Sequence, residues 1–169
     1  MDIIEFAMKM EQDGKQFYEK SAAETTDPEL KKILVQLAEE ERNHYEFFRR
    51  MKEKPIDLSA GEVLSGESTL KEVKNIFEVM ASNKDKKPFG EDVVAVWTQA
   101  LRTEEKAVKF YTEEAAKESD DERKGLLLKI AKEEENHVLM IDSVLMYVKH
   151  PAAFAASAQY KNFRSAEGF

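Results

Sequence analysis

Apolar residues recur at intervals of three and four along most of this chain, which is the spacing of one face of an α-helix. The pattern predicts four long helices, at 3–24, 28–53, 91–119 and 121–150. In each helix a glutamate occupies a position that the periodicity assigns to the core. The four inward stripes are Ile4, Ala7, Glu11, Gly14 and Tyr18; Leu30, Leu34, Leu37, Glu41, His44, Phe48 and Met51; Trp97, Leu101, Glu104, Val108, Tyr111 and Ala115; and Leu127, Ile130, Glu134, His137, Ile141, Val144 and Val148.

Capping and breaking residues mark the ends of these helices. Asp27 and Pro28 offer an N-cap and a first-turn proline to the second helix, while Pro55 prevents its easy continuation. Residues 55–90 then form a long crossover, within which the pattern predicts a shorter helix at about 69–81. We therefore expect an all-α four-helix bundle over residues 1–150, followed by a loosely attached tail at 151–169.

The chain contains a gapless internal repeat. The phrase Leu37-Ala38-Glu39-Glu40-Glu41-Arg42-Asn43-His44 returns as Ile130-Ala131-Lys132-Glu133-Glu134-Glu135-Asn136-His137, 93 positions later. Each copy ends in Glu-x-x-His, and residues three apart on a helix share a face. The same offset pairs Glu11 with Glu104 and Tyr18 with Tyr111. The repeat therefore duplicates one set of polar residues on the core side of the helices.

Composition limits the chemistry that these residues can perform. The 169 residues contain no Cys, which excludes disulfides, iron–sulfur ligation and thiolate zinc sites within them. A formal net charge of −8 argues against a nucleic-acid partner. The N-terminus has no basic leader, and no apolar run approaches the roughly 18 residues that a membrane span needs. We expect a cytoplasmic protein with no membrane partner.

The negative charges of four inward-facing glutamates must be balanced by positive charge. An unpaired carboxylate in an apolar interior costs several kcal/mol, and the stripes contain no Lys or Arg. Two divalent cations would balance four carboxylates and two neutral imidazoles. One Glu from each of two helices, with Glu-x-x-His from each of the other two, is the ligand pattern of di-iron bundles, and it suits iron or manganese. The candidate ligands are Glu11, Glu41, His44, Glu104, Glu134 and His137.

Several alternatives stay open at this point. Glu40 and Glu133 compete as ligands, because residues four apart also share a helical face. Glu105 is the rival of Glu104 if the register of its helix is shifted by one. A further alternative is an exposed acidic face with chance histidines, which the constant offset of the repeat disfavours.

Three other residues have two interpretations each. Tyr18 and Tyr111 lie two turns after the first Glu of each copy, where each phenol could hydrogen-bond a metal-bridging carboxylate or simply pack in the core. Gly14 costs its helix about 1 kcal/mol relative to Ala. It could provide space beside the metals or allow close packing of helices.

Two phrases resemble a known family. Met10-Glu11-Gln12-Asp13-Gly14-Lys15-Gln16-Phe17-Tyr18 and Ala38-Glu39-Glu40-Glu41-Arg42-Asn43-His44 are similar to the di-iron domain of rubrerythrins, in the ferritin-like di-iron carboxylate superfamily. The resemblance spans about residues 6–146. It implies a ferritin-like four-helix bundle that binds two iron ions, with Mn or Zn possible. It also implies roles for the six ligands: Glu11 and Glu104 are terminal, Glu41 and Glu134 bridge the metals, and His44 and His137 each complete one metal.

The chain departs from the family pattern in two respects. Rubrerythrins usually carry a rubredoxin-like domain with four Cys, so here the electrons must come from a separate donor such as a rubredoxin-like protein. They also usually carry an additional Glu three residues after the helix-three ligand, where this chain has Ala107. Its mate in the repeat is Gly14. These residues make the expected site more symmetric and more like a bacterioferritin centre.

The resemblance implies a non-haem di-iron oxidoreductase that reduces peroxide or oxidises Fe(II) with oxygen or peroxide. The alternatives are a non-catalytic iron-binding or iron-handling protein and a structural bundle that holds zinc inertly. We expect a homodimer, in which the crossover could connect helices within one chain or between two.

Overall fold

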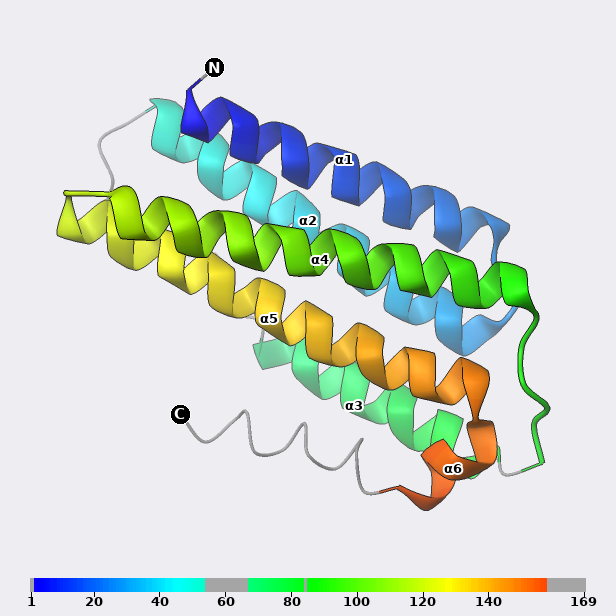
Figure 1. The fold of residues 1–169 in the computed structure, drawn as a ribbon. Coiled ribbons are helices and arrows are strands. Elements are labelled where there is room, and N and C mark those ends of the chain that lie inside the picture. The colour runs from blue at the N-terminus through cyan, green and yellow to red at the C-terminus, as the bar shows by residue number, and fades with distance from the viewer. Residues whose placement is uncertain (1, 54–66, 84, 158–169) are drawn as a thin grey trace. The chain divides into compact units, whose positions relative to one another are not determined.

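The computed structural model describes residues 2–53, 67–83 and 85–157, and all their regular secondary structure is helical (Figure 1). The all-α prediction is confirmed, and the four long helices begin and end within two residues of the predicted bounds. The chain divides into two compact units, residues 1–69 and 70–169. The helices are α1 (Ile3–Glu24), α2 (Pro28–Glu53), α3 (Glu67–Ser82), α4 (Glu91–Lys117), α5 (Asp121–Lys149) and α6 (Pro151–Ala156).

In the first unit α1 and α2 form a helical hairpin and lie side by side (Figure 1). A three-residue connection turns the chain, and Asp27 then caps α2. Its Oδ1 accepts hydrogen bonds from the backbone N–H groups of Glu29 and Leu30, each at 3.0 Å. This side chain satisfies two donors that the first turn of a helix leaves without partners inside the helix.

In the second unit α4 and α5 form a second hairpin. Asp120, the repeat mate of Asp27, caps α5 by accepting a hydrogen bond from the N–H of Arg123 at 2.8 Å. The repeat therefore includes the turn signal as well as the core residues. In both hairpins an aspartate therefore caps the second helix by accepting a backbone N–H three residues further along the chain.

The predicted stripe of α4 is corrected by the structure. Leu101 and Val108 are half-buried, whereas Ala100 and Ala107 are buried at 0% and 6% exposure. Both sets are compatible with a buried Glu104, because residues three or four positions away in either direction share its helical face. Ala100 and Ala107 satisfy this spacing as well as Leu101 and Val108 do. The buried face of α4 thus has alanines on both sides of Glu104, at Ala100 and Ala107.

Residues 151–156, which we expected to belong to a loose tail, form helix α6. Phe154 is fully buried, and its ring contacts Phe77 of α3 and Tyr147 of α5 at centroid distances of 5.9 and 5.5 Å. These edge-to-face contacts hold α6 on the second unit. The remainder of the predicted tail, 158–169, and residues 54–66 of the crossover lie outside the described residues; the helix predicted within the crossover is α3.

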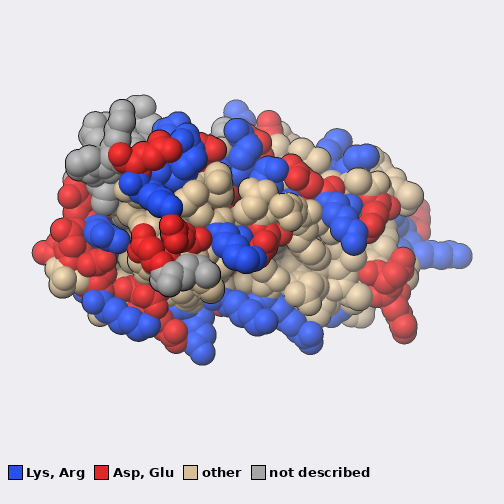
Figure 2. All heavy atoms as spheres, turned by 90° about the horizontal axis from the view of Figure 1, so that it is seen from above, with Lys and Arg blue, Asp and Glu red and all other residues tan. Residues whose placement is uncertain are grey.

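Acidic and basic side chains are interspersed on the face shown in Figure 2. Many of them pair along one helix, as Lys15 and Glu19 do at 2.8 Å. Such exposed pairs contribute at most about 1 kcal/mol each. In the described part of the chain, no helix is long and apolar enough to cross a membrane.

Candidate metal centre

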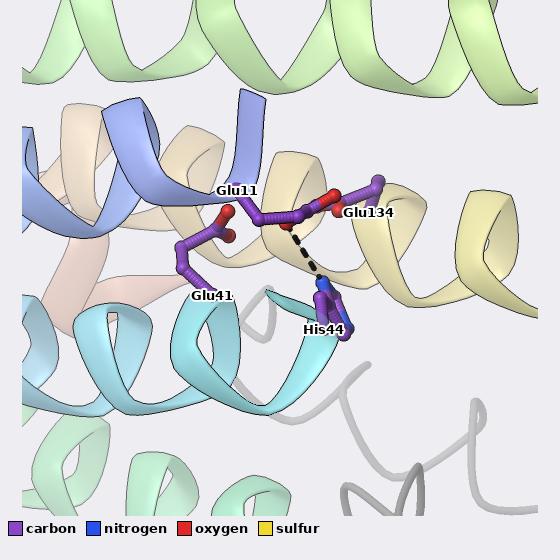
Figure 3. A group of neighbouring side chains, drawn as sticks. All are labelled: Glu11, Glu41, His44 and Glu134. Carbon is purple, nitrogen blue, oxygen red and sulfur yellow. Dashed lines mark ion pairs between the residues drawn. The ribbon is translucent and has the colours of Figure 1, made fainter. Parts of the chain in front are cut away.

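The first unit brings together three predicted ligands from two helices. Glu11 extends from α1, and Glu41 and His44 extend from α2 (Figure 3). Their exposed fractions are 2%, 4% and 1%. Each offers one ligand atom, and these atoms lie within 4.8 Å of one another. His44 Nδ1 is 3.3 Å from Glu11 Oε2.

The second unit repeats the arrangement. Glu104 extends from α4, and Glu134 and His137 extend from α5, with exposed fractions of 2%, 1% and 0%. Their ligand atoms also lie within 4.8 Å of one another. His137 Nδ1 is 2.9 Å from Glu134 Oε2 and 3.7 Å from Glu104 Oε2. We call the two sets of three residues the first and second triads.

The predicted ligands are distinguished from their rivals by burial. Glu105 is exposed, and Glu40 and Glu133 are half-buried, so the helix registers are those that the stripes predicted for the glutamates. Among the described residues, the buried Asp, Glu, Lys, Arg and His side chains are the six members of the two triads and no others. In this part of the chain, every buried carboxylate and imidazole is therefore one of the candidate ligands that the repeat predicts.

The donor set of each triad fits a divalent cation. An imidazole nitrogen and a carboxylate oxygen about 3 Å apart both present lone pairs unless a proton or a cation lies between them. No Lys or Arg is buried in the described chain to neutralise the carboxylates. One divalent ion per triad balances two carboxylates and one neutral imidazole, and carboxylate oxygen with imidazole nitrogen suits iron, manganese or zinc.

Gly14 provides space for a ligand. A Cβ atom added to it would lie 2.8 Å from Glu41 Oε2 and 3.3 Å from the Cδ of the same carboxylate. Real Cβ atoms essentially never approach a heavy atom to within 3.0 Å. Of the two interpretations of this glycine, the structure favours space beside the ligands, because the nearest atoms belong to a carboxylate and not to helix backbone.

The two tyrosines of the repeat are fully buried. Each packs edge to face against the phenylalanine that precedes it, with ring centroids 5.4 Å apart for Phe17 and Tyr18 and 5.2 Å for Phe110 and Tyr111. Their predicted hydrogen bonds to bridging carboxylates stay a prediction.

Burial and, to a smaller extent, the neighbouring Glu134 carboxylate together raise the pKa of Glu104 to about 7, against an opposing effect of His137. Taking a charge out of water disfavours its ionised form, and so does a second negative charge nearby. At neutral pH, protons therefore compete with a cation for this carboxylate.

This shift predicts a pH dependence of stability in the chelated protein. Glu104 has a folded-state pKa near 7 and an ordinary value of 4.5, so between these values the folded state binds more protons than the unfolded state. The free energy of unfolding should fall by about 3 kcal/mol as the pH rises from about 4.5 to about 7, and then level off. Urea denaturation of chelated wild type and Glu104→Gln at both pH values measures it. If the free energy of unfolding changed by the same amount with pH in wild type and in Glu104→Gln, the raised pKa could not belong to Glu104.

One comparison with known proteins gives a match. The sequence model of the Rubrerythrin family matches residues 1–52, which hold α1, nearly all of α2 and the whole first triad. No curated protein and no solved structure matches the chain. The buried Glu and His cluster, taken with this match, indicates a metal site. The resemblance drawn from the sequence is confirmed over residues 1–52, and the helices with their buried carboxylates are consistent with a rubrerythrin-family di-iron domain.

Proposed function

We propose that the two triads together hold two iron ions in one carboxylate-bridged site, and that the protein is an oxidoreductase of rubrerythrin type. One observation carries the proposal: in the described chain the buried charged residues are the six ligands that the repeat predicts. A fold gains nothing from burying four carboxylates without cations to balance them. The match to the Rubrerythrin family favours iron over manganese or zinc.

Two adjacent irons, when bound, supply the two electrons that reduce one peroxide, with two protons, to two waters. The part of the protein's own residues is to bind the two ions and to orient them. Glu11 and Glu104 would each hold one ion from the first helix of a hairpin, and Glu41 and Glu134 would each contribute a carboxylate that the two ions share. Their burial excludes bulk water, which strengthens each metal–carboxylate interaction.

Electrons must then be replaced from outside these 169 residues. They contain no Cys, so they cannot form a cysteine-ligated electron-entry centre of the rubredoxin type. A separate rubredoxin-like protein is the proposed donor. The expected homodimer and the cytoplasmic location stay predictions.

The test is stopped-flow oxidation of anaerobic Fe(II)-loaded protein by peroxide. We expect oxidation faster than that of Fe(II) in buffer, about one peroxide consumed per pair of irons, and no further consumption until a reductant is added. Oxidation at the rate of Fe(II) in buffer, with normal binding of two ions, would overturn the enzyme proposal in favour of the second candidate, iron handling without turnover.

A further inference from the structure

The outer side of α5 carries two leucines that are about half exposed, Leu128 at 46% and Leu139 at 52%. Single exposed leucines are common on protein surfaces and need no explanation. These two belong to one stripe of exposed residues, because residues at intervals of three and four share a helical face. The members of this α5 stripe are Lys124, Leu128, Lys132, Glu135, Leu139 and Asp142.

The α5 stripe is symmetric about its midpoint, except that its charges change sign there. Its N-terminal half is basic and its C-terminal half is acidic, and each half contains one leucine. Residues equally far from the midpoint therefore match as leucine with leucine or as lysine with a carboxylate. The matched pairs are Leu128 with Leu139, Lys132 with Glu135 and, to within one residue, Lys124 with Asp142.

This symmetry suits a second copy of the same helix. Two copies that meet antiparallel about a two-fold axis place each residue opposite its match, so leucine meets leucine and every lysine meets a carboxylate. A parallel pair in register would instead bring like charges together. Within the described chain neither Lys124 nor Asp142 has an ion-pair partner. Opposite charges across an interface select the partner and its orientation.

An apolar groove continues the stripe. It lies between α4 and α5, which are side by side in the second unit (Figure 1), and its apolar walls are Val108, Val138 and Leu139. Its volume of about 310 Å³ is at the lower end of the roughly 300–1,000 Å³ that small-molecule sites occupy. Leu128 of a second copy, opposite Leu139 in the antiparallel pair, would lie at this groove and bury more apolar surface there.

The first copy of the repeat lacks the pattern. On α2, Glu46 occupies the position that matches Leu139, and Arg49 occupies that of the acidic end residue. Antiparallel pairing of two α2 helices would bring Val35 opposite a glutamate and Lys31 close to an arginine. Arg49 and Glu46 also pair with each other along α2, at 2.8 Å. The self-complementary face therefore belongs to α5 alone among these two matched helices.

We propose that two copies of this chain associate through their α5 stripes, antiparallel, with Leu128 of each copy against Leu139 of the other and Lys132 against Glu135. The proposal goes beyond the proposed function, because it assigns a surface to the homodimer that the sequence predicts and does not depend on bound metal. The stripe is about 27 Å long at 1.5 Å per residue. One helix against one helix is a small contact, so we expect a weak dimer with a Kd on the order of 10 μM.

The experiment is sedimentation equilibrium of the full chain, from about one tenth to about ten times that Kd. The average mass of wild type should rise from 19.4 kDa toward twice that value. Lys132→Glu places glutamate opposite glutamate and Glu135→Lys places lysine opposite lysine, so each variant alone should associate at least about tenfold more weakly. An equimolar mixture of the two variants should associate like wild type, because each charge then meets its opposite.

Glu39→Lys and Arg42→Glu are the matched controls. They change an exposed pair on α2 at the positions that the repeat matches to Lys132 and Glu135. Each makes the same change in net charge as its counterpart, and each lies equally close to a triad. Both should associate like wild type, alone and in an equimolar mixture. Circular dichroism of all four variants checks that they fold.

Three results would overturn the proposal. Wild type that keeps a mass of 19.4 kDa throughout would leave the α5 stripe to solvent or to a different protein. Single variants that dimerise like wild type would place the interface elsewhere, and a mixture that stays monomeric would exclude the antiparallel arrangement. If a charge variant does not fold, Leu139→Ser removes an apolar contact at a half-exposed position. It should weaken association about tenfold, and unchanged association would likewise overturn the proposal.

Discussion

Glu41→Ala and Glu134→Ala should each lose most of both metal ions, with metal content falling from about two per chain to well below one. The reason is the bridging role proposed for these carboxylates, since a bridge contacts both ions. Each substitution also removes one of four negative charges, and the remaining charges then balance two divalent cations less well. Elemental analysis of protein purified without added metal, followed by Fe(II) titration, measures the effect.

The neighbouring residues offer matched controls. Glu40 and Glu133 precede the two proposed bridging residues on the same helices and are half-buried. Glu40→Ala and Glu133→Ala make the same change in charge and size, and we expect both to retain about two ions per chain. Loss of a single ion in Glu41→Ala or Glu134→Ala would show that the triads bind independently, and unchanged metal content would show that neither residue is a ligand.

The sequence predicted the helices and the burial of the six candidate ligands because these depend on local signals. The 3-4 spacing gave the bounds of the long helices, and Asp27 with Pro28 marked the start of α2. The glutamates could be assigned to the core because a constant offset repeated them with the same neighbours. A shift of one residue would have placed Glu105 inside and left the repeat without an explanation, whereas the structure has Glu105 exposed.

Features that depend on contacts between distant residues could not be predicted. Six residues, Pro151–Ala156, are too few for periodicity to identify a helix, and α6 is held by the contacts of Phe154 with Phe77 and Tyr147. The role of Gly14 likewise required the position of a carboxylate on another helix. The sequence showed that a side chain was missing there, but only the structure shows which group occupies the space.

Removal of metal should lower the melting temperature by about 10 °C while the protein stays helical. A ligand that binds only the folded state, present at about a thousand times its Kd, adds about 4 kcal/mol, and 1 kcal/mol shifts the melting temperature of a chain of this size by about 2–4 °C. Metal-free protein keeps its apolar core, including Leu34, Trp97 and Ile141, so far-UV circular dichroism should change little. Scanning calorimetry of the chelated and the Fe(II)-loaded protein, both kept anaerobic, measures the difference.

The double variant His44→Ala/His137→Ala separates a specific effect from a general one. It removes the nitrogen ligand of each triad, so its melting temperature should hardly respond to chelation. A chelator that acted on the protein by any other route would lower the melting temperature of the variant and of wild type alike. Equal melting temperatures for chelated and loaded wild type would mean that the buried carboxylates are neutralised by protons in both samples, because no Lys or Arg is buried in the described chain to replace the metal.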